Sequence, residues 1–258
     1  MGTSIAITSG KGGVGKSTVC ISLGMVLARA GYRVCLIDVD LGLKNLDVMM
    51  GLENRVFYDL YDAMNGKCSL NKAILRDKRE ENLYLLPACK SINVKDFNGN
   101  DLKLVVEELK RSFDYVLLDS PAGIESGFMH SLHCADRVIL VTTLDITAIQ
   151  DADRIIGLLM KENIETIQVI MNRVNPRFIE KGISVRMEDA LSWLSVELLG
   201  IVYEDENIAR GNNRGNPHVL DEKNLTSECF ENIRARLFGE NVALPKYREK
   251  NILRKLFN

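Results

Sequence analysis

Short apolar runs alternate with longer segments of helical spacing along most of the chain. The short runs predict strands at residues 4–9, 33–38, 82–87, 114–119, 137–143, 166–172 and 199–203. Apolar residues at helical spacing predict helices at residues 19–29, 102–111, 147–161, 185–198 and 226–237. This alternation is typical of an α/β fold in which helices cover both faces of a doubly wound, mostly parallel sheet. We expect one domain over residues 1–244, with only residues 245–258 set apart.

The first predicted strand and helix are joined by a glycine-rich loop, Gly-Lys-Gly-Gly-Val-Gly-Lys-Ser-Thr, at residues 10–18. Its spacing is G-x-x-x-x-G-K-[ST], which cradles nucleotide phosphates when it lies between a strand and a helix. Glycines let backbone N–H groups close around the phosphates, and the start of the helix adds partial positive charge. Lys16 is expected to reach the β- and γ-phosphates of ATP, and Ser17 to bind Mg²⁺. The loop residues expected to contact ATP or ADP are Gly12, Gly13, Val14, Gly15, Lys16, Ser17 and Thr18.

Acidic residues end two of the predicted strands. Asp38 closes the second strand and Asp40 follows it, while Asp119 ends a mostly apolar strand. Functional groups gather at the carboxyl ends of parallel strands, and a carboxylate after a buried strand commonly holds Mg²⁺. We therefore assign Asp38 and Asp119 to the metal, and Asp40 to the γ-phosphate and the attacking water. Asp38 and Asp40 can both face the site only if the chain bends, which Gly42 would permit. The alternatives are solvated turn acids for Asp38 and Asp40, and a helix cap or turn residue for Asp119.

Composition limits the class of protein. Of the 258 residues, 46% are hydrophobic and 26% are charged, as in soluble globular proteins. The net charge of −2 argues against a surface coated in basic residues for nucleic acid. Six scattered cysteines without a C-x-x-C pair indicate reduced thiols in a cytoplasmic protein rather than disulfides or metal ligands. No apolar run approaches the ~20 residues that span a bilayer, and the early first strand leaves no room for a signal peptide.

A second lysine, Lys11, follows the first glycine of the loop, where the phosphate-binding pattern sets no requirement. It is either a solvated surface charge or a cation aimed at a phosphate, in its own subunit or in a facing one. The form K-G-G-V-G-K-S-T resembles the deviant Walker A motif of the MinD/ParA ATPases. That resemblance implies a homodimer with ATP and a monomer without it, in which Lys11 contacts the partner's nucleotide much as an arginine finger does. Lys11, Lys16 and Asp40 are then the expected catalytic residues.

Further segments resemble the septum-placing MinD branch of that family, in the family order and over essentially the whole chain: residues 38–47, 50–59, 82–88, 119–125 and 151–157. The resemblance implies a Mg²⁺-dependent ATPase that dimerises on ATP and attaches to an anionic membrane surface at the inner face of the cell membrane. It also implies recruitment of a MinC-like septation inhibitor. A MinE-like partner, or another topological factor, would stimulate hydrolysis and release the protein.

The same resemblance assigns residues around the base of the nucleotide. Asn172, at the end of a predicted strand, would hydrogen-bond adenine, with Arg173 packed nearby. Glu204 and Asp205 would close over the base. Residues 38–40 would form switch I, and residues 119–123 would form switch II.

Two positions depart from the family. Tyr203 stands where a proline is usual, so the backbone of the adenine-side loop is expected to differ. Leu144 and Asp145 replace a Pro-Glu pair whose acid faces the partner's early lysine, which leaves open whether the shorter Asp145 serves there. The three histidines have neither a nearby nucleophile in the sequence nor metal-like spacing, and we interpret them as structural: His130, His133 and His218.

The closing residues 245–258 differ in character from the rest of the chain. They read Pro-Lys-Tyr-Arg-Glu-Lys-Asn-Ile-Leu-Arg-Lys-Leu-Phe-Asn, with five cations and one acid. On a helix the apolar residues would share one face with a basic flank, which is typical of an interfacial membrane anchor. The alternative is a terminal helix folded back on the body, and the family resemblance favours the membrane. The expected membrane-binding residues are Ile252, Leu253, Leu256, Phe257, Arg254 and Lys255.

Other classes of protein share the phosphate loop. A ParA-like ATPase for DNA or plasmid partitioning should show a basic DNA-facing patch and needs no amphipathic tail. A FlhG-like flagellar-number regulator would keep the tail but usually carries an extension before the first strand. A nitrogenase-type reductase needs cluster cysteines at a dimer face, and a metabolic kinase needs a second substrate pocket. We expect no specific nucleic-acid partner.

Overall fold

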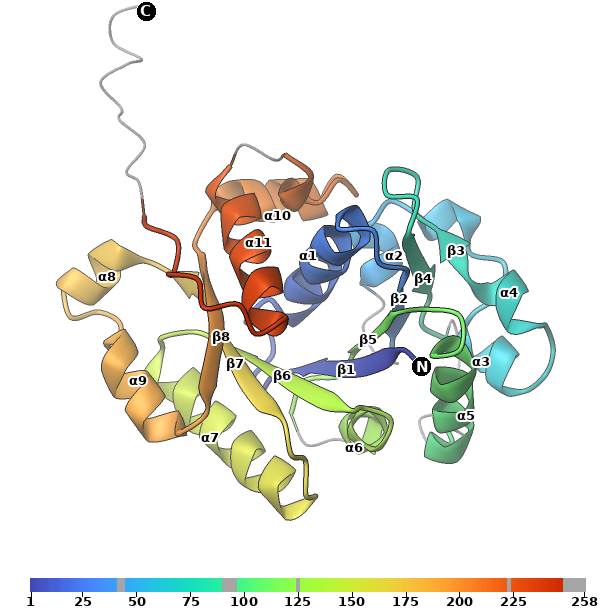
Figure 1. Ribbon diagram of the computed structural model, residues 1–258, viewed down its shortest axis with the longest axis horizontal. Helices are drawn as coiled ribbons and strands as arrows, with labels where there is room; N and C mark the ends of the chain where they lie inside the picture. Colours follow the sequence, from blue (N-terminus) through green and yellow to red (C-terminus); the bar gives the residue numbers. More distant parts are fainter. Residues whose placement is uncertain (41–44, 90–96, 124–125, 222–223, 248–258) are drawn as a thin grey trace, which may run out of the picture.

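The computed structural model describes residues 1–40, 45–89, 97–123, 126–221 and 224–247 (Figure 1). At its centre is an eight-stranded sheet whose strands lie in the order β3-β4-β2-β5-β1-β6-β7-β8. Every pairing is parallel except that of β3 with β4. The bounds are β1 (Thr3–Thr8), β2 (Val34–Asp38), β3 (Leu75–Arg76), β4 (Leu83–Leu86), β5 (Tyr115–Asp119), β6 (Arg137–Thr142), β7 (Ile167–Val174) and β8 (Glu197–Tyr203). The predicted doubly wound, mostly parallel α/β fold is confirmed.

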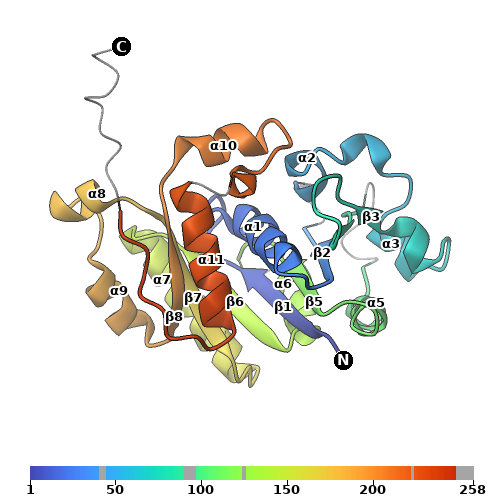
Figure 2. The same cartoon turned by 45° about the horizontal axis from the view of Figure 1, so that its top comes forward.

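Helices cover both faces of this sheet. Their bounds are α1 (Lys16–Arg29), α2 (Leu46–Met49), α3 (Leu60–Met64), α4 (Leu70–Ala73), α5 (Gly99–Leu109), α6 (Ser126–His133), α7 (Ile146–Lys161), α8 (Pro176–Glu180), α9 (Met187–Leu194), α10 (Glu206–Asn212) and α11 (Leu225–Leu237). Short 3₁₀ helices lie at Glu53–Arg55 and His218–Leu220. Helices α1 and α11 pack side by side on one face, and α5, α6, α7 and α9 lie on the other (Figures 1 and 2).

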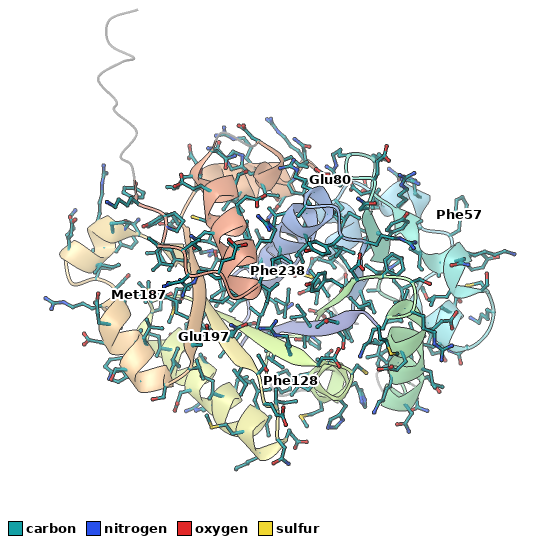
Figure 3. All side chains as sticks on the ribbon, viewed as in Figure 1. Phe57, Glu80, Phe128, Met187, Glu197 and Phe238 are labelled. Carbon is teal, nitrogen blue, oxygen red and sulfur yellow. The ribbon has the colours of Figure 1, made fainter. Side chains whose placement is uncertain are left out.

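Side chains of the central strands alternate between the two helical layers. In β1, Ile5 and Ile7 pack with α1 and α11, whereas Ala6 between them packs with α6 and α7. Because both faces of a parallel strand are buried, its sequence is a continuous apolar run rather than an alternating one. Figure 3 shows Phe128 of α6 in the lower layer and Phe238 at the end of α11, where its ring stacks on Tyr32.

One predicted helix is wrong at its end. The helix predicted over residues 185–198 stops at Leu194, Ser195 takes a left-handed conformation with φ 52°, and β8 begins at Glu197. Val196 and Leu198 continue the helical spacing, but pairing with β7 places these residues in or beside the sheet instead. The sequence patterns do not predict β3, which has two residues, or the short helices α2, α3, α4, α6, α8 and α10, because one or two helical turns carry little periodicity.

The carboxyl ends of the strands form one edge, and this edge positions the site. In the register of the sheet, Asp119 of β5 pairs with Asp38 of β2 on one side and with Ile7 of β1 on the other. The glycine-rich loop follows β1 directly, so it lies beside both carboxylates. No helix within the described ranges has the length and apolar character needed to cross a bilayer.

Candidate nucleotide site

The phosphate loop connects β1 to α1, and its backbone depends on glycine at two positions. Gly15 takes a left-handed conformation, with φ 94° and ψ 24°, directly before Lys16, the first residue of α1. Gly10 packs against the backbone of Asp151 in α7, and a Cβ added at Gly10 would lie 2.5 Å from that carbonyl group. Gly12 and Gly13 are exposed. The loop therefore offers its backbone to a ligand, with the amino end of a 14-residue helix behind it.

Asn172 of β7 holds this loop from the side. Its Nδ2 donates a hydrogen bond of 2.7 Å to the carbonyl oxygen of Val14, and the residue is only 4% exposed. A Cβ at Gly15 would collide with the same Nδ2. The sequence predicts an adenine contact for Asn172, which stays a prediction, and does not foresee this bond to the loop. The bond fixes the amide group beside the place where the nucleotide is expected.

Lys16 and Asp119 form a buried ion pair. Lys16 Nζ lies 2.7 Å from Asp119 Oδ1, and the two side chains are 8% and 1% exposed. Burial acts to lower the pKa of Lys16, but the charge of Asp119 and the hydrogen bond to it outweigh burial, so the pKa of Lys16 is raised. The ammonium group is thus held in its charged form at the start of α1, where a phosphate would lie.

Asp38 is buried at the end of β2 and accepts three backbone hydrogen bonds. The N–H of Asp40 donates to Oδ1 at 3.1 Å, and the N–H groups of Asn45 and Leu46 each donate to Oδ2 at 3.3 Å. Burial and the neighbouring charge of Asp119 raise the pKa of Asp38 to about 8, although the three N–H groups act to lower it. The carboxyl group of Asp38 therefore tends to keep its proton when no cation is bound, and a bound cation would favour its carboxylate form.

Asp40 lies two residues beyond Asp38, the last residue of β2. The hydrogen bond from its own N–H to Asp38 Oδ1 closes a local turn of the kind that aspartate side chains favour. The predicted bend stays a prediction, because Gly42, which we expected to permit it, lies outside the described residues. Asp40 is half-buried. Its position two residues beyond Asp38 places it at the same edge as the phosphate loop.

The donor set at this edge fits a Mg²⁺ ion bound together with a nucleotide. Within the described ranges, no group of three or more His, Cys, Asp or Glu is arranged to hold a metal by itself. Asp119 Oδ2 is buried, and the described part of the chain offers it no hydrogen-bond partner. Mg²⁺ is usually held through one or two carboxylates, with waters and substrate phosphates completing the octahedron. Ser17 in the first turn of α1, with Asp38 and Asp119, meets that requirement.

Lys11 reaches the start of α7. Its Nζ donates a hydrogen bond of 3.0 Å to Oγ1 of Thr147, and the lysine is exposed. Asp145, at the N-cap position of α7, accepts a 2.7 Å bond from the hydroxyl of Thr143. The sequence does not predict roles for Thr143 or Thr147, although polar residues directly after an apolar strand were a usable signal. Lys11 and Asp145 therefore lie at the same helix end.

A cavity of about 300 Å³ opens beside the phosphate loop. Arg173 reaches it from an irregular end of β7, where the residue has φ 53° and the register with β8 shifts. The sequence does not predict Phe178, which also lines the cavity and is 43% exposed. The cavity brings together residues from the loop, the β6–α7 connection, the end of β7, helix α8, the α8–α9 connection and the end of β8: Lys11, Gly12, Gly13, Val14, Thr143, Leu144, Asp145, Arg173, Phe178, Ser184 and Glu204.

Glu204 and Asp205 have different surroundings although they are adjacent. The N–H of Glu204 donates to the carbonyl of Val174 at 3.0 Å, and its carboxylate accepts a 2.9 Å bond from Asn175 Nδ2, so Glu204 is fastened to the end of β7. Asp205 instead caps α10 by accepting from the N–H of Asn207 at 3.0 Å. Of this predicted pair, the structure brings Glu204 to the cavity.

The remaining predicted residues have separate positions. Thr18 Oγ1 accepts a 2.9 Å bond from Asn212 Nδ2, which ties α1 to α10. His133 Nε2 lies 3.3 Å from a Glu162 carboxylate oxygen, and His218 Nε2 lies 3.6 Å from one of Asp205. All six cysteines are free. The residues predicted to bind a membrane lie outside the described residues: Ile252, Leu253, Leu256, Phe257, Arg254 and Lys255.

A parallel sheet with a G-x-x-x-x-G-K-[ST] loop after its central strand, and two carboxylates at the same edge, defines a P-loop nucleotide-binding protein. Residues 5–219 match the family described as the CobQ/CobB/MinD/ParA nucleotide binding domain. The chain belongs to this family.

Individual relatives are similar over nearly the whole chain. The septum site-determining protein MinD of Bacillus subtilis is 46% identical over 97% of this chain and 94% of its own length. Among solved structures, the MinC:MinD cell division protein complex of Aquifex aeolicus superimposes with a TM-score of 0.88 at 41% identity, covering 95% of this chain and 99% of that one. MinD of Pyrococcus horikoshii, complexed with Mg-ADP, gives a TM-score of 0.81 at 29% identity, covering 92% and 96%.

Proposed function

We propose that this protein is a Mg²⁺-dependent ATPase that places the cell-division septum. The observation that carries the proposal is the meeting of Lys16 with Asp38 and Asp119 at one edge of the sheet, in a chain related to septum site-determining proteins over nearly its full length. The reaction is hydrolysis of ATP to ADP and phosphate. The Mg-ADP bound to the Pyrococcus horikoshii relative supports the choice of nucleotide and metal.

Each residue of the site has a distinct task in this reaction. The backbone of residues 12–15 and the start of α1 bind the phosphates, and Lys16 carries its charge to the β- and γ-phosphates. Ser17, Asp38 and Asp119 hold the metal. A Mg²⁺ ion bound there would neutralise part of the negative charge on the phosphates. Asp40 orients the attacking water, and the base lies beside Asn172, Arg173, Glu204 and Asp205.

Lys11 completes the site of a second copy of the chain. Thr147 holds its ammonium group at the start of α7, at the rim of the cavity that also contains Asp145. An exposed cation beside a nucleotide cavity can contact the nucleotide of a facing subunit, as arginine fingers do. ATP therefore favours a homodimer because it binds the dimer more tightly than the monomers, and hydrolysis returns the protein to monomers.

Residues 1–244 form the ATPase domain, and residues 245–258 form the tail, which attaches the dimer to an anionic membrane surface at the inner face of the cell membrane. Because Pro245 and Tyr247 contact the body, the part of the tail that enters the membrane lies beyond Tyr247. Burying four apolar side chains yields at most ~6–12 kcal/mol, from ~1.5–3 kcal/mol each. Ordering roughly ten residues costs about 1 kcal/mol or more per residue, which removes most of that gain. One tail is a marginal anchor, while two tails on one dimer gain effective concentration. ATP thus controls attachment through dimerisation.

The membrane-bound form recruits a septation inhibitor that resembles MinC. The support is the MinC:MinD complex of Aquifex aeolicus, whose MinD chain is 41% identical to this one. A MinE-like partner, or another topological factor, stimulates hydrolysis and releases the protein to the cytoplasm. The cycle of ATP binding and hydrolysis thereby restricts the inhibitor to those parts of the membrane where the protein is bound.

The test is co-sedimentation with anionic phospholipid vesicles in ATP and in ADP. The full chain is compared with a chain ending at Tyr247, a cut that preserves the described contacts of Pro245 and Tyr247 with the body. Leu253→Asp tests the tail within the full chain, and Leu104→Asp, at a position 69% exposed on α5, is the matched control. With ATP, we expect the full chain and Leu104→Asp to pellet with the vesicles, and neither the chain ending at Tyr247 nor Leu253→Asp to do so. With ADP, we expect none of them to pellet.

Three results would overturn parts of this proposal. Equal vesicle binding in ATP and ADP, or equally tight binding by a monomer-locked variant, would show that ATP-driven dimerisation does not control attachment to the membrane. Binding by the shortened chain would remove the tail as the anchor. Pelleting of the ATP form with DNA, independent of the tail, would support a partitioning ATPase instead.

A further inference from the structure

The chain after α11 returns along β8, the edge strand of the sheet, as a segment without regular structure that we call the strap, residues 240–247 (Figures 1 and 2). The strap is fastened first near the start of β8. There the Arg236 guanidinium donates to carbonyl groups of β8 and, at 3.0 Å, to the carbonyl of Val242. Asn232 Nδ2 of α11 donates to the carbonyl of Ala243 at 2.7 Å. The strap thus follows β8 from one end of the sheet towards the other.

Tyr203, the last residue of β8, fastens the far end of the strap. Its hydroxyl donates a 2.8 Å hydrogen bond to the carbonyl of Pro245. The rings of Tyr203 and Tyr247 lie 5.2 Å apart between centroids. Pro245 is buried, and Leu244 packs against the core shared by α7 and α9. One side chain therefore fixes the strap at the carboxyl edge of the sheet.

Tyr203 also adjoins the side of the nucleotide cavity where the adenine base is proposed to lie, which we call the base side. Glu204 follows Tyr203 directly, lines the cavity and donates its N–H to Val174 of β7. The segment at Tyr203 and Glu204 is thus held by β7 on one side and by the strap on the other. A shift of Tyr203 and Glu204 together towards a base would change the contacts of the Tyr203 hydroxyl, because the two residues share one planar peptide unit.

We propose that Tyr203 is a positioning residue that braces the base side of the nucleotide site against the strap, so that nucleotide binding and the fastening of Tyr247 are linked. The inference rests on the proposed placement of the base beside Glu204. Linkage is reciprocal: if the fastened strap favours nucleotide binding, bound nucleotide favours the fastened strap by the same factor. Tyr247 directly precedes residues 248–258, so the link extends to the point from which the proposed membrane anchor leaves the body.

The test uses the full chain and needs no membrane. Tyr203→Phe keeps the ring but removes the hydrogen bond from the hydroxyl to Pro245. Tyr115→Phe is the matched control, since Tyr115 is a partly buried tyrosine at the opposite end of the sheet. Two quantities are measured for each variant: the dissociation constant for a fluorescent, non-hydrolysable ATP analogue, and hydrogen exchange of the strap amides with and without that analogue.

In the wild-type protein and in Tyr115→Phe, the analogue should slow exchange at Tyr247. In Tyr203→Phe that protection should disappear, and the dissociation constant should rise by about three- to tenfold, the range that a net hydrogen bond supports. If the wild type binds the analogue tightly but the hydrogen-exchange rates of its strap amides do not change, the inference is overturned and the ATPase proposal stays intact. A wild type that does not bind the analogue would overturn both. Unchanged binding and protection in Tyr203→Phe would assign Tyr203 a purely structural role and overturn the inference.

Discussion

Lys16 Nζ lies 2.7 Å from Asp119 Oδ1, inside a site where neither side chain is more than 8% exposed. The two residues are 103 positions apart in the sequence and meet because β1 and β5 are neighbours in the sheet. The lysine expected to bind phosphate and the aspartate expected to bind metal therefore form an ion pair with each other. The charge of each group depends on the other, since an unpaired charge in such a place is costly.

Replacing Lys16 by alanine should abolish ATP binding and also destabilise the protein. The ammonium group is expected to hold the phosphates, and its removal leaves Asp119 buried beside Asp38 without a cation. Breaking a buried pair costs about 3 kcal/mol or more, which urea denaturation would detect. The double variant Lys16→Ala/Asp119→Asn should recover part of that stability but not ATP binding. A single variant as stable as the wild type would contradict the ion pair's contribution.

Asp40→Ala should bind ATP normally and hydrolyse it at least about 100-fold more slowly, the usual scale for losing a group that positions or deprotonates a nucleophile. Phosphate release measures the rate, and a fluorescent ATP analogue measures affinity. Asp189→Ala, an exposed acid on α9, serves as the matched control and should hydrolyse normally. Wild-type turnover by Asp40→Ala would show that the water is oriented by another group.

Asn172→Ala should loosen the phosphate loop. It removes the buried 2.7 Å bond to Val14 and leaves that carbonyl without its partner, a loss of about 1–3 kcal/mol. We expect a lower free energy of unfolding without nucleotide, and ATP affinity that falls by about tenfold or more. Asn65→Ala removes an amide-to-carbonyl bond of 2.8 Å in the α3 segment, outside both the nucleotide site and the strap, and should leave ATP affinity unchanged. Equal affinity in Asn172→Ala and the wild type would rule out this bracing role.

Stability without nucleotide and Mg²⁺ should fall as pH rises between about 4 and about 8. The pKa of Asp38 is raised to about 8 in the folded chain, whereas an unfolded aspartate titrates near 3.9. In that window the folded state binds the extra proton, so the unfolding free energy decreases with pH by up to about 1.4 kcal/mol per unit.

Urea denaturation from pH 5 to pH 8 measures this slope. The slope should be smaller in Asp38→Asn, which cannot titrate at that position, and smaller in the wild type with Mg²⁺ and ATP, since a bound cation favours the carboxylate. An unchanged slope in Asp38→Asn would show that another group carries the pH dependence.

Features that depend on residues close together in the sequence could be predicted from the sequence. The glycine-rich loop and Asp119 could be located because a strand, a tight turn and a helix start impose their own residue types over fewer than ten positions. Asp38 could be placed at a strand end for the same reason, whereas its bond to the N–H of Asp40 was not predicted. The end of the predicted helix over residues 185–198 was wrong because pairing with β7 overrode an apolar spacing that fits either structure.

The sequence by itself determined the class of fold, the phosphate loop and the acids at the strand ends, because periodicity and short motifs are encoded by neighbouring residues. Only the tertiary structure decided which distant residues meet: Lys16 with Asp119, Asn172 with Val14, Lys11 with Thr147, and Tyr203 with Pro245. Those contacts depend on strand order and register, which arise when both faces of the whole sheet are buried at once.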